Sequence, residues 1–402
     1  MCKIYVIGTD GGPLTEGQRR LLANCGLIVA ARRFAPVAAE LGLPFHDISP
    51  LAAAIDVLRR QTGDGKVAVL VGGDPLYYGI GKRLLAEFDH ERLHFFPATT
   101  ALQRACALFR MPWDDAVVTS LHGRSYRHLP GLLLRHGKNL LFTDPSNTPD
   151  GIARTLLAYL DLIGEKELAR DIAVLVAEEL GQPGEAIFRG DLAATAGRSF
   201  AALNVLALLV PGGEPPACRF GLVEEELSHS RGLITKNEVR AATLHQLRLP
   251  RRGVLWDIGA GSGSVSIEAA RLNPDLVVYA IEEKAEQLAN ITANIRKYRC
   301  YNVIPVSGRA PQSCAHLPEP QRIFIGGSGG NLAAIIAMAA SRLAAGGLLV
   351  VNGVIAATVD TAPRLMAEDG LQVTQTTVQV TRYDGQGAIA TFNPITIITG
   401  RT

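Results

Sequence analysis

The sequence contains little cysteine, and its cysteines are scattered. Six occur in 402 residues, and no two of them form a Cys-x-x-Cys pair. This spacing favours neither a zinc site nor a disulfide framework, and it indicates a reducing compartment. We therefore expect a cytoplasmic protein that binds no metal ion. The six are Cys2, Cys25, Cys106, Cys218, Cys300 and Cys314.

The chain also lacks a long, unbroken apolar run. Met1 leads directly into the strand-like stretch 3–8, without the basic head and apolar segment of a secretory signal. The longest uncharged stretch, 343–359, is interrupted by three glycines and Asn352, which is typical of a turn followed by a buried strand. The sequence therefore predicts neither a secretory signal nor a membrane partner.

Net charge is nearly absent as well. Lys and Arg total 40 against 38 for Asp and Glu, which gives +2. Tight, non-specific binding of nucleic acid or of an anionic membrane needs a larger excess of positive charge, so neither partner is expected. Hydrophobic residues make up 48% and charged residues 19%, so folded cores are expected rather than disorder or a coiled coil. The length suggests two or three domains.

One breaker-rich run divides the chain. Residues 211–216 read Pro-Gly-Gly-Glu-Pro-Pro, which can continue neither a helix nor a strand. On each side, short Val/Ile/Leu/Ala runs alternate with amphipathic segments, a pattern typical of α/β units around a largely parallel sheet. We predict domains at 1–210 and 219–402, joined by a linker at 211–218. A break near residues 111–113 predicts two lobes within the first domain.

The expected strands of the first half are 3–8, 27–30, 66–71, 93–96, 139–142, 171–177 and 204–210. Those of the second half are 253–258, 276–281, 303–306, 322–325 and 347–352, with a late antiparallel edge pair at 372–380 and 394–398.

The clearest motif follows strand 253–258. Asp257 is followed by three alternating glycines, Gly259, Gly261 and Gly263, which let the backbone approach a ligand closely. The spacing fits the pyrophosphate fingerprint Gly-x-Gly-x-x-Gly badly. S-adenosylmethionine has no phosphate; Asp257 would meet its ammonium group, and Glu282, after the next strand, would bind its ribose hydroxyls. Another nucleotide and ordinary βα turns are the alternatives.

Two later segments complete this predicted site. Gly308 and Ala310 follow the third strand, where the adenine edge is expected. A glycine run ends the fourth strand, at the edge of the sheet where ligands bind, so we assign its residues to the substrate; the alternative is a flexible loop before a helix at 332–343. These residues are Gly326, Gly327, Ser328, Gly329 and Gly330.

Basic residues precede the motif. Thr235 and Glu238 have the spacing of a capping box, and Lys236 and Arg240 are four apart, so they share a helix face. Our hypothesis is that Arg231, Lys236 and Arg240 are catalytic-site residues that hold the carboxylates of an acidic substrate. A solvated helix face is the alternative.

The second half resembles a known family on these motifs. The segments 231–240, 256–268 and 325–330 occur in the order seen in the decarboxylating precorrin methyltransferases of cobalamin biosynthesis. The resemblance covers nearly all of 219–402, and it implies a Rossmann-like class I fold that uses S-adenosylmethionine.

The first half resembles a second family, the tetrapyrrole (corrin and porphyrin) methylases. The likeness rests on the segments 8–15, 69–81, 97–103, 143–144 and 178–181, which end successive strands. It implies a two-lobed α/β fold that binds S-adenosylmethionine between its lobes. Two departures are visible: Asp10 lies in the first glycine-rich turn, and a threonine pair stands where serines are commoner. The implied cofactor contacts are Gly73, Asp74, Pro75, Tyr78, Thr99 and Thr100.

Both halves together resemble the fused precorrin methyltransferases. The resemblance implies one S-adenosylmethionine site per domain. It also implies methylation of carbon 5 of the macrocycle by the first half, and methylation of carbon 15 with loss of CO₂ from the ring C acetate by the second. We expect a homo-oligomer. An RNA or protein methyltransferase, or a regulatory protein that binds S-adenosylmethionine, is the alternative.

Overall fold

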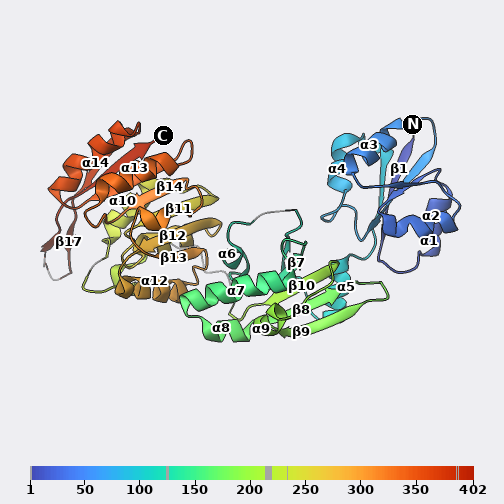
Figure 1. The fold of residues 1–402 in the computed structure, drawn as a ribbon, viewed down its shortest axis with the longest axis horizontal. Helices are drawn as coiled ribbons and strands as arrows, with labels where there is room; N and C mark the ends of the chain where they lie inside the picture. Colours follow the sequence, from blue (N-terminus) through green and yellow to red (C-terminus); the bar gives the residue numbers. More distant parts are fainter. Residues whose placement is uncertain (1, 124–125, 213–219, 233, 386, 388) are drawn as a thin grey trace. The chain divides into compact units, whose positions relative to one another are not determined.

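The computed structural model describes residues 2–123, 126–212, 220–232, 234–385, 387 and 389–402. The chain divides into two compact units, each made of several segments (Figure 1). Unit 1 comprises residues 1–124, 138–151 and 173–209, and unit 2 comprises residues 125–137, 152–172 and 210–402. The boundary that the sequence predicts at 211–218 stays a prediction, because residues 213–218, with Cys218, lie outside the described residues.

Unit 1 begins with a parallel sheet in the order β3-β2-β4-β1-β5. Its two long strands pair in register from Lys3 opposite Lys66 to Thr9 opposite Gly72, so both end at the same edge. The strands are β1 (Lys3–Thr9), β2 (Ile28–Ala30), β3 (Phe45–Asp47), β4 (Lys66–Gly72) and β5 (Leu93–Phe96). Between them lie α1 (Glu16–Ala23), α2 (Ala35–Glu40), α3 (Leu51–Arg60) and α4 (Gly81–Glu87), with 3₁₀ turns at Arg32–Phe34 and His90–Arg92.

A second sheet of unit 1 has the order β6-β7-β10-β8-β9, and only its β6–β7 pair is parallel. The expectation of a largely parallel sheet is therefore wrong for this lobe. Two lobes are present, as predicted, but α5 packs on the second sheet, so they separate between β5 and α5 and not near residues 111–113. The strands are β6 (Val117–Ser120), β7 (Lys138–Phe142), β8 (Ala173–Glu178), β9 (Ala186–Asp191) and β10 (Asn204–Leu209), and α5 (Ala101–Phe109) and α9 (Leu192–Ala196) belong to the same lobe.

Three strands of unit 1 were not predicted, namely β3, β6 and β9. The first two have three and four residues, which is too short for a clear alternation of apolar and polar side chains. The third is an edge strand whose side chains stay exposed or partly exposed, so its sequence carries no apolar face.

Unit 2 contains a seven-stranded sheet in the order β13-β12-β11-β14-β15-β19-β16. Its first five strands are parallel, and the two late strands are antiparallel, as predicted. Of the late pair only β16 is an edge strand, because β19 lies between β15 and β16. The strands are β11 (Gly253–Ile258), β12 (Leu276–Glu282), β13 (Val303–Ser307), β14 (Arg322–Ile325), β15 (Leu348–Gly353), β16 (Gln372–Val378) and β19 (Ile395–Arg401), with a hairpin of β17 (Thr381–Tyr383) and β18 (Ile389–Thr391).

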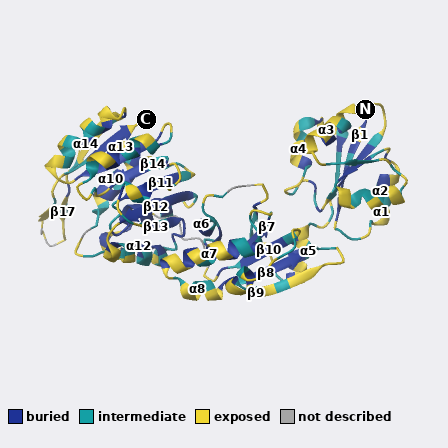
Figure 2. Ribbon diagram, viewed as in Figure 1, coloured by how far each residue is buried: buried dark blue, intermediate teal, exposed yellow. Residues whose placement is uncertain are grey.

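Helices flank this sheet, and the strands form its buried centre (Figure 2). Trp256 and Phe324 are large, fully buried side chains, each worth about 1.5–3 kcal/mol of burial. The helices are α6 (Leu129–Leu133), α7 (Pro149–Ile163), α8 (Lys166–Asp171), α10 (Asn237–Leu247), α11 (Ser264–Leu272), α12 (Ala285–Tyr298), α13 (Leu332–Arg342) and α14 (Ala356–Glu368), with 3₁₀ turns at Glu224–Glu226 and Gln312–Cys314. Within the described residues, none of the helices has the length and apolar character needed to cross a membrane.

Candidate active sites

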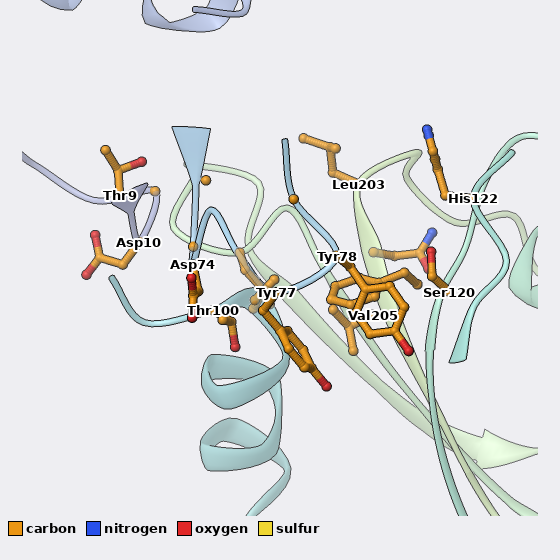
Figure 3. A pocket seen from close by; sticks show the side chains of 18 of the residues that line it. Thr9, Asp10, Asp74, Tyr77, Tyr78, Thr100, Ser120, His122, Leu203 and Val205 are labelled. Carbon is orange, nitrogen blue, oxygen red and sulfur yellow. The ribbon is translucent and has the colours of Figure 1, made fainter. Parts of the chain in front are cut away.

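A cavity of about 1010 Å³ lies in unit 1, lined by residues of both of its sheets. Asp10, Asp74 and Thr100 lie along one side, and Ser120 and His122 lie along the other (Figure 3). Five of the six cofactor contacts implied for this half line the cavity, and Pro75 does not. The five are Gly73, Asp74, Tyr78, Thr99 and Thr100.

Close backbone packing forms one wall of the cavity. A Cβ atom at Gly8 would lie 1.9 Å from the carbonyl oxygen of Gly73, and one at Gly73 would lie 3.1 Å from the Cα atom of Thr100. Gly73 also has a φ of +68°, which favours glycine. The ends of β1 and β4 and the start of α5 therefore meet only because two of the three residues have no side chain.

Asp74 and Pro75 shape the turn after β4. The Oδ1 atom of Asp74 accepts a hydrogen bond of 2.8 Å from the amide of Leu76. The carbonyl of Pro75 accepts one of 2.8 Å from the amide of Gly81. A Cβ atom at Gly79 would lie 2.4 Å from that same oxygen. Pro75 thus acts through the conformation of the turn rather than through contact with the cavity.

Tyr78 connects the two lobes at the edge of the cavity. Its φ is +52°, a conformation that costs a non-glycine residue about 1–3 kcal/mol. Its hydroxyl donates to the carbonyl of Val118 at 3.2 Å, and its ring centroid lies 5.7 Å from that of Phe142. The side chain is half exposed. This strained backbone holds an aromatic face toward the cavity.

The threonine pair has a structural role at its second member. The hydroxyl of Thr100 accepts a hydrogen bond of 3.2 Å from the amide of Gln103, and the side chain of Gln103 returns to the amide of Thr100 at 2.9 Å. This capping box begins α5. The hydroxyl of Thr100 is thus already used, whereas its backbone lies against Gly73.

Asp10, the departure from the family pattern, lines the same cavity. Its Oδ1 atom accepts a hydrogen bond of 3.0 Å from the amide of Gly12, which closes the glycine-rich turn on itself. A Cβ atom at Gly11 would lie 2.9 Å from the carbonyl oxygen of Leu180. The turn therefore packs against the segment after β8, and Asp10 stabilises its shape.

Sequence reasoning missed three basic side chains that line this cavity: Arg33, Lys82 and His122. The guanidinium carbon of Arg33 lies 4.8 Å from the centroid of the Phe34 ring, and burial lowers the pKa of this arginine. Arg33 could have been found from sequence, since it follows the buried strand β2 closely. His122 follows β6, the short strand that was not predicted.

The second site is built on the carboxyl ends of four strands in unit 2. The amides of Gly259 and Ala260 both donate to the carbonyl of Ile281 at 3.0 Å. The amide of Gly308 donates to the carbonyl of Glu282 at 3.0 Å, and the amide of Gly326 donates to that of Ile258 at 2.9 Å. The loops after β11, β12, β13 and β14 are thereby brought together, as the sequence predicts.

The three predicted glycines have the backbone that requires glycine. Gly259, Gly261 and Gly263 have φ values of +67°, +56° and +76°. A Cβ atom at Gly259 would lie 2.3 Å from the carbonyl oxygen of Gly327, so this glycine brings the first loop against the fourth. Around Gly261 a Cβ atom would meet nothing within 4 Å among the described atoms.

Glu282 holds the glycine loop. Its Oε2 atom accepts a hydrogen bond of 2.9 Å from the amide of Gly261. Its Oε1 atom accepts bonds of 3.0 Å from the amides of Glu283 and Lys284. The carboxylate is therefore at the junction of the first and second loops, and its predicted contact with ribose hydroxyls stays a prediction.

Asp257 is fully buried beneath the glycine loop. Its Oδ2 atom accepts hydrogen bonds from the amide and the hydroxyl of Ser266, at 3.1 and 2.6 Å, and its Oδ1 atom has no hydrogen-bond partner among the described residues. Burial, helped by the nearby charge of Glu282, raises the pKa of Asp257 to about 7 against the hydrogen bonds from Ser266. Asp257 thus anchors the start of α11, and its predicted contact with an ammonium group stays a prediction.

The raised pKa of Asp257 predicts a pH-dependent stability. Because the folded carboxyl binds its proton up to about pH 7 and the unfolded one only to about 3.8, the folded state loses stability as pH rises between these values. Asp257→Asn has no proton to lose. We expect the unfolding temperature of the variant to rise relative to wild type between pH 5 and pH 8, as measured by scanning calorimetry. If the unfolding temperatures of the variant and of wild type changed in parallel with pH, the raised pKa of Asp257 would be contradicted.

In the third loop one of the predicted residues is buried, and Arg309 joins the neighbouring loops. Gly308 has a φ of +139° and turns the chain after β13. Ala310 is buried in the hydrophobic core of the sheet. Arg309, between them, donates to the carbonyl of Gly329, and its Nε atom lies 4.0 Å from a carboxylate oxygen of Glu283. Arg309 thus connects the second, third and fourth loops.

The glycine run after β14 takes the position predicted for it. A Cβ atom at Gly326 would lie 3.2 Å from the carbonyl oxygen of Gly259, so the run begins in contact with the first glycine loop. Gly329 and Gly330 have φ values of +55° and +83°, and the amide of Asn331 donates to the carbonyl of Ser328 at 2.9 Å. The run is a defined turn, and its contact with a substrate stays a prediction.

The structure corrects the hypothesis for Arg240, whose side chain is 2% exposed. Its guanidinium donates to the carbonyls of Leu222 and Thr235, and its Nε atom lies 3.8 Å from the buried carboxylate of Glu268. Such a group cannot reach a substrate in this structure. Lys236 lies at the N-cap, before the helix begins, so the helix face predicted for the two residues is not formed, and α10 turns Arg240 into the protein.

The predicted capping box is also wrong. Helix α10 begins at Asn237, with Lys236 at the N-cap and no side-chain cap. Lys236 forms an ion pair of 2.5 Å with Glu224, and Glu238 pairs with Arg382 at 2.7 Å. Of the three predicted basic residues, Arg231 alone has a largely exposed side chain, at 81%, with its charge 3.8 Å from Glu286.

Two asparagines that sequence reasoning missed hold the segment before α10 against the glycine loop. The Nδ2 atom of Asn294 donates to the carbonyls of Ser228 and Ser262, at 2.9 and 3.0 Å. Asn290, one turn earlier on α12, donates to the hydroxyl of Ser230 at 2.8 Å. The spacing of four residues on one helix was the signal available in the sequence.

Comparison with known proteins identifies both halves. A model of Tetrapyrrole (Corrin/Porphyrin) Methylases matches residues 3–196, and a model of the Precorrin methyltransferase domain matches residues 226–400. A precorrin-6Y C(5,15)-methyltransferase [decarboxylating] of Sinorhizobium sp is 32% identical over 87% of this chain and 83% of its own length. The chain belongs to the precorrin-6Y C(5,15)-methyltransferase (decarboxylating) family. Members are named as methyltransferases that decarboxylate, and this chain is such a C-methyltransferase, which uses S-adenosylmethionine.

Two proteins that match only part of this chain are similar to it as well. A probable cobalt-precorrin-6B C(15)-methyltransferase (decarboxylating) of Pyrobaculum calidifontis is 37% identical over 44% of this chain and 94% of its own length. A solved structure of precorrin-6y C5,15-methyltransferase from Geobacter metallireducens GS-15 shares 40% identity, covers 46% of this chain and 97% of that chain, and has a TM-score of 0.45.

The described residues of unit 2 have features that fit S-adenosylmethionine. The donor is a zwitterionic nucleoside without phosphate, so it needs close backbone, a carboxylate for the ribose and an acceptor for the ammonium. The left-handed glycines bring backbone close together, and the carboxylate of Glu282 lies beside them. Asp257 is fully buried beneath the loop, so its contact with the ammonium group stays a prediction. In unit 1 the cavity has a similar wall, where Gly73 packs against the backbone of Thr100.

Proposed function

We propose that the chain methylates reduced precorrin-6Y (precorrin-6B) at carbons 5 and 15 and removes CO₂ from the ring C acetate, giving precorrin-8. In this proposal each half binds its own S-adenosylmethionine. The observation that carries it is that each unit has its own set of glycine-rich loops at strand ends, with a cavity beside those of unit 1. A reaction that transfers two methyl groups to one acceptor needs either two such sites or two catalytic cycles at a single site.

The assignment of carbons to halves rests on the partial relative. That protein is named for carbon 15 and decarboxylation only, and it spans 44% of this chain. The second half alone has the length and the family model of a precorrin methyltransferase domain, at residues 226–400. We therefore assign carbon 15 and decarboxylation to unit 2, and carbon 5 to the cavity of unit 1.

Positioning is the main task of both sites. S-adenosylmethionine supplies an activated methyl group, and the electron-rich meso carbon of a reduced macrocycle is its acceptor. The residues therefore need to hold the two reactants in line at near contact, which contributes up to about 7–11 kcal/mol. In this proposal the loops that pack together at Gly73 and Gly259 hold the reactants, and no nucleophilic side chain is needed; a Cβ atom at either glycine would meet the neighbouring loop.

Decarboxylation adds one requirement in unit 2. The bond between the acetate methylene and its carboxylate breaks, CO₂ leaves, and the electron pair passes into the macrocycle, which takes up a proton. A carboxylate that is to leave is best held less firmly than the others. Arg231, exposed beside the site, is our candidate for holding a peripheral carboxylate, and Lys236 is a weaker one because Glu224 already neutralises it.

The macrocycle is a polycarboxylate, and three basic side chains line the cavity of unit 1 beside three acidic ones. Its acidic side chains are already engaged by backbone amides: Asp10 by Gly12, Asp74 by Leu76, and Asp144 by Gly123. Hydrogen bonds, first from the amide of Gly123, lower the pKa of Asp144. We propose that Arg33, Lys82 and His122 bind the substrate carboxylates there.

Mass spectrometry of the purified chain with S-adenosylmethionine and reduced precorrin-6Y tests the function. We expect a product with two added methyl groups and one CO₂ lost. In the double variant Arg33→Ala/Lys82→Ala we expect the methyl transfer assigned to unit 1 to fall by at least about tenfold, since each charged hydrogen bond is worth about 1.5–3 kcal/mol. The methyl transfer and decarboxylation assigned to unit 2 stay at the wild-type rate.

Arg60→Ala/Lys166→Ala is a control with two basic residues that do not line the cavity. An unchanged substrate in the wild-type reaction, with methylation of RNA or protein instead, would overturn the function. Equal effects of the two double variants would overturn the substrate contacts alone. A cytoplasmic homo-oligomer without nucleic-acid or membrane partners remains part of the proposal, and a gel shift with bulk RNA tests the nucleic-acid part.

A further inference from the structure

Part of the first half of the sequence belongs to unit 2. Residues 126–137, with α6, and residues 152–163 of α7 form what we call the docking segment. It contacts the surface of the second half formed by Asp275, Arg296 and residues 301–303. This contact is within one compact unit, although its two sides are separated in sequence by the predicted linker.

Buried polar groups join the two sides. The hydroxyl of Tyr159, a buried side chain on α7, donates to the carbonyl of Val303 at 2.7 Å. The Nε2 atom of His128 lies 2.8 Å from the carbonyl oxygen of Tyr301, so it carries the hydrogen. Burial lowers the pKa of His128 to about 4, and the ring is thus neutral at pH 7. Both carbonyls would lose their partners if the segment separated.

Shape and charge fit as well. A Cβ atom at Gly131 would lie 2.8 Å from the Cα atom of Asn302, so the helix touches the second half at a residue without a side chain. Arg135 forms an ion pair of 2.7 Å with Asp275, and Arg296 donates to the carbonyl of Ile163 at 2.7 Å. Buried hydrogen bonds, close packing and charge pairs together are typical of a specific interface.

The contact leaves the proposed ligand site free. Val303 begins β13, and Asp275 directly precedes β12, so the docking segment lies at the amino ends of these strands. The glycine loops and Glu282 are at the carboxyl ends. A parallel sheet has its ligand edge and its opposite edge a full strand length apart.

We propose that the docking segment is a built-in binding surface for the second half, which holds residues 220–402 to the first half without the covalent linker. The partner that fits this surface is thus the second half of the same chain. This inference does not depend on the proposed substrate or reaction. It predicts that the linker can be cut without separation of the two pieces.

The experiment uses the full chain with a site-specific protease sequence placed within residues 213–219, cut after purification. Size-exclusion chromatography with light scattering at about 1 μM should show both polypeptides in one species, which corresponds to an interaction stronger than about 8 kcal/mol. Elution of the wild-type pieces as two separate folded species would overturn the proposal.

Two variants locate the surface. Gly131→Val places a side chain against Asn302, and we expect the dissociation constant of the cut chain to rise at least about 100-fold. Gly65→Val is the matched control, since a Cβ atom at Gly65 meets nothing within 4 Å. Tyr159→Phe is a milder change. It removes the hydroxyl that donates to the carbonyl of Val303 and should weaken association by about tenfold. If Gly131→Val failed to fold, Tyr159→Phe would decide; affinity equal to that of wild type in Tyr159→Phe, or equal effects of the two valine variants, would overturn the assignment.

Discussion

Replacement of Arg240 by alanine is expected to lower the free energy of unfolding of unit 2 by about 3–5 kcal/mol, the range for breaking a buried ion pair on one side. The guanidinium is 2% exposed, and the carboxylate of Glu268 beside it is fully buried. That carboxylate also accepts hydrogen bonds from the amides of Gly221 and Leu222, at 3.4 and 2.5 Å. Without Arg240 it would remain buried and would lose this ion-pair partner.

The backbone near Arg240 would lose its partners too. The carbonyls of Leu222 and Thr235 accept hydrogen bonds from the guanidinium, so this side chain helps to hold the chain before α10 to the helix. Burial lowers the pKa of Arg240, although Glu268 and other acidic groups oppose that change. We therefore expect Arg240 to stabilise the protein through these contacts rather than to act on a substrate.

Scanning calorimetry of the full chain, with the transition of unit 2 followed separately, measures this effect. Arg231→Ala is the matched control: its side chain is 81% exposed, and we expect a change within about 0.5 kcal/mol. The double variant Arg240→Ala/Glu268→Gln should lose less than the sum of the two single variants, because the charge left unpaired is then absent. Wild-type stability in Arg240→Ala, with loss of turnover, would restore the substrate role.

Arg240 also shows where sequence reasoning reaches its limit. Four-residue spacing from Lys236 predicts a common helix face, but Lys236 lies at the N-cap, before the helix begins. Whether Arg240 faces solvent depends on Glu268, which another segment places beside it. The same holds for Lys236, whose pairing with Glu224 involves a 3₁₀ turn that the sequence did not reveal.

The features that could be predicted are local ones. Glycine and an acidic residue after an apolar run indicate a strand end at which another backbone segment or a ligand comes close. The sequence therefore predicts the loops at Gly73, Asp257 and Glu282 before any contact is known. The cavity residues Arg33 and His122 come from two different sheets, and only the fold brings them together. Sheet direction in the second lobe is likewise set by pairing between distant strands, not by the composition of each strand.

Gly259→Ala is expected to abolish binding of S-adenosylmethionine at the site of unit 2. The new Cβ atom would lie 2.3 Å from the carbonyl oxygen and 2.8 Å from the amide nitrogen of Gly327, which are backbone atoms and cannot rotate away. The loops after β11 and β14 would have to separate, and the close wall of the proposed site would be lost. We expect affinity at this site to fall at least about 100-fold.

Isothermal titration of the full chain separates this effect from strain alone. Wild type should bind two equivalents of S-adenosylmethionine and Gly259→Ala one, because the cavity of unit 1 is unchanged. Gly261→Ala is the matched control: its φ of +56° is as unfavourable for alanine, but its Cβ atom meets nothing within 4 Å. The φ strain costs about 1–2 kcal/mol, so Gly261→Ala should keep two equivalents with weaker binding at one. Two full-affinity equivalents in Gly259→Ala would show that the donor does not depend on contact between these loops, and the site would then have to be placed elsewhere in unit 2.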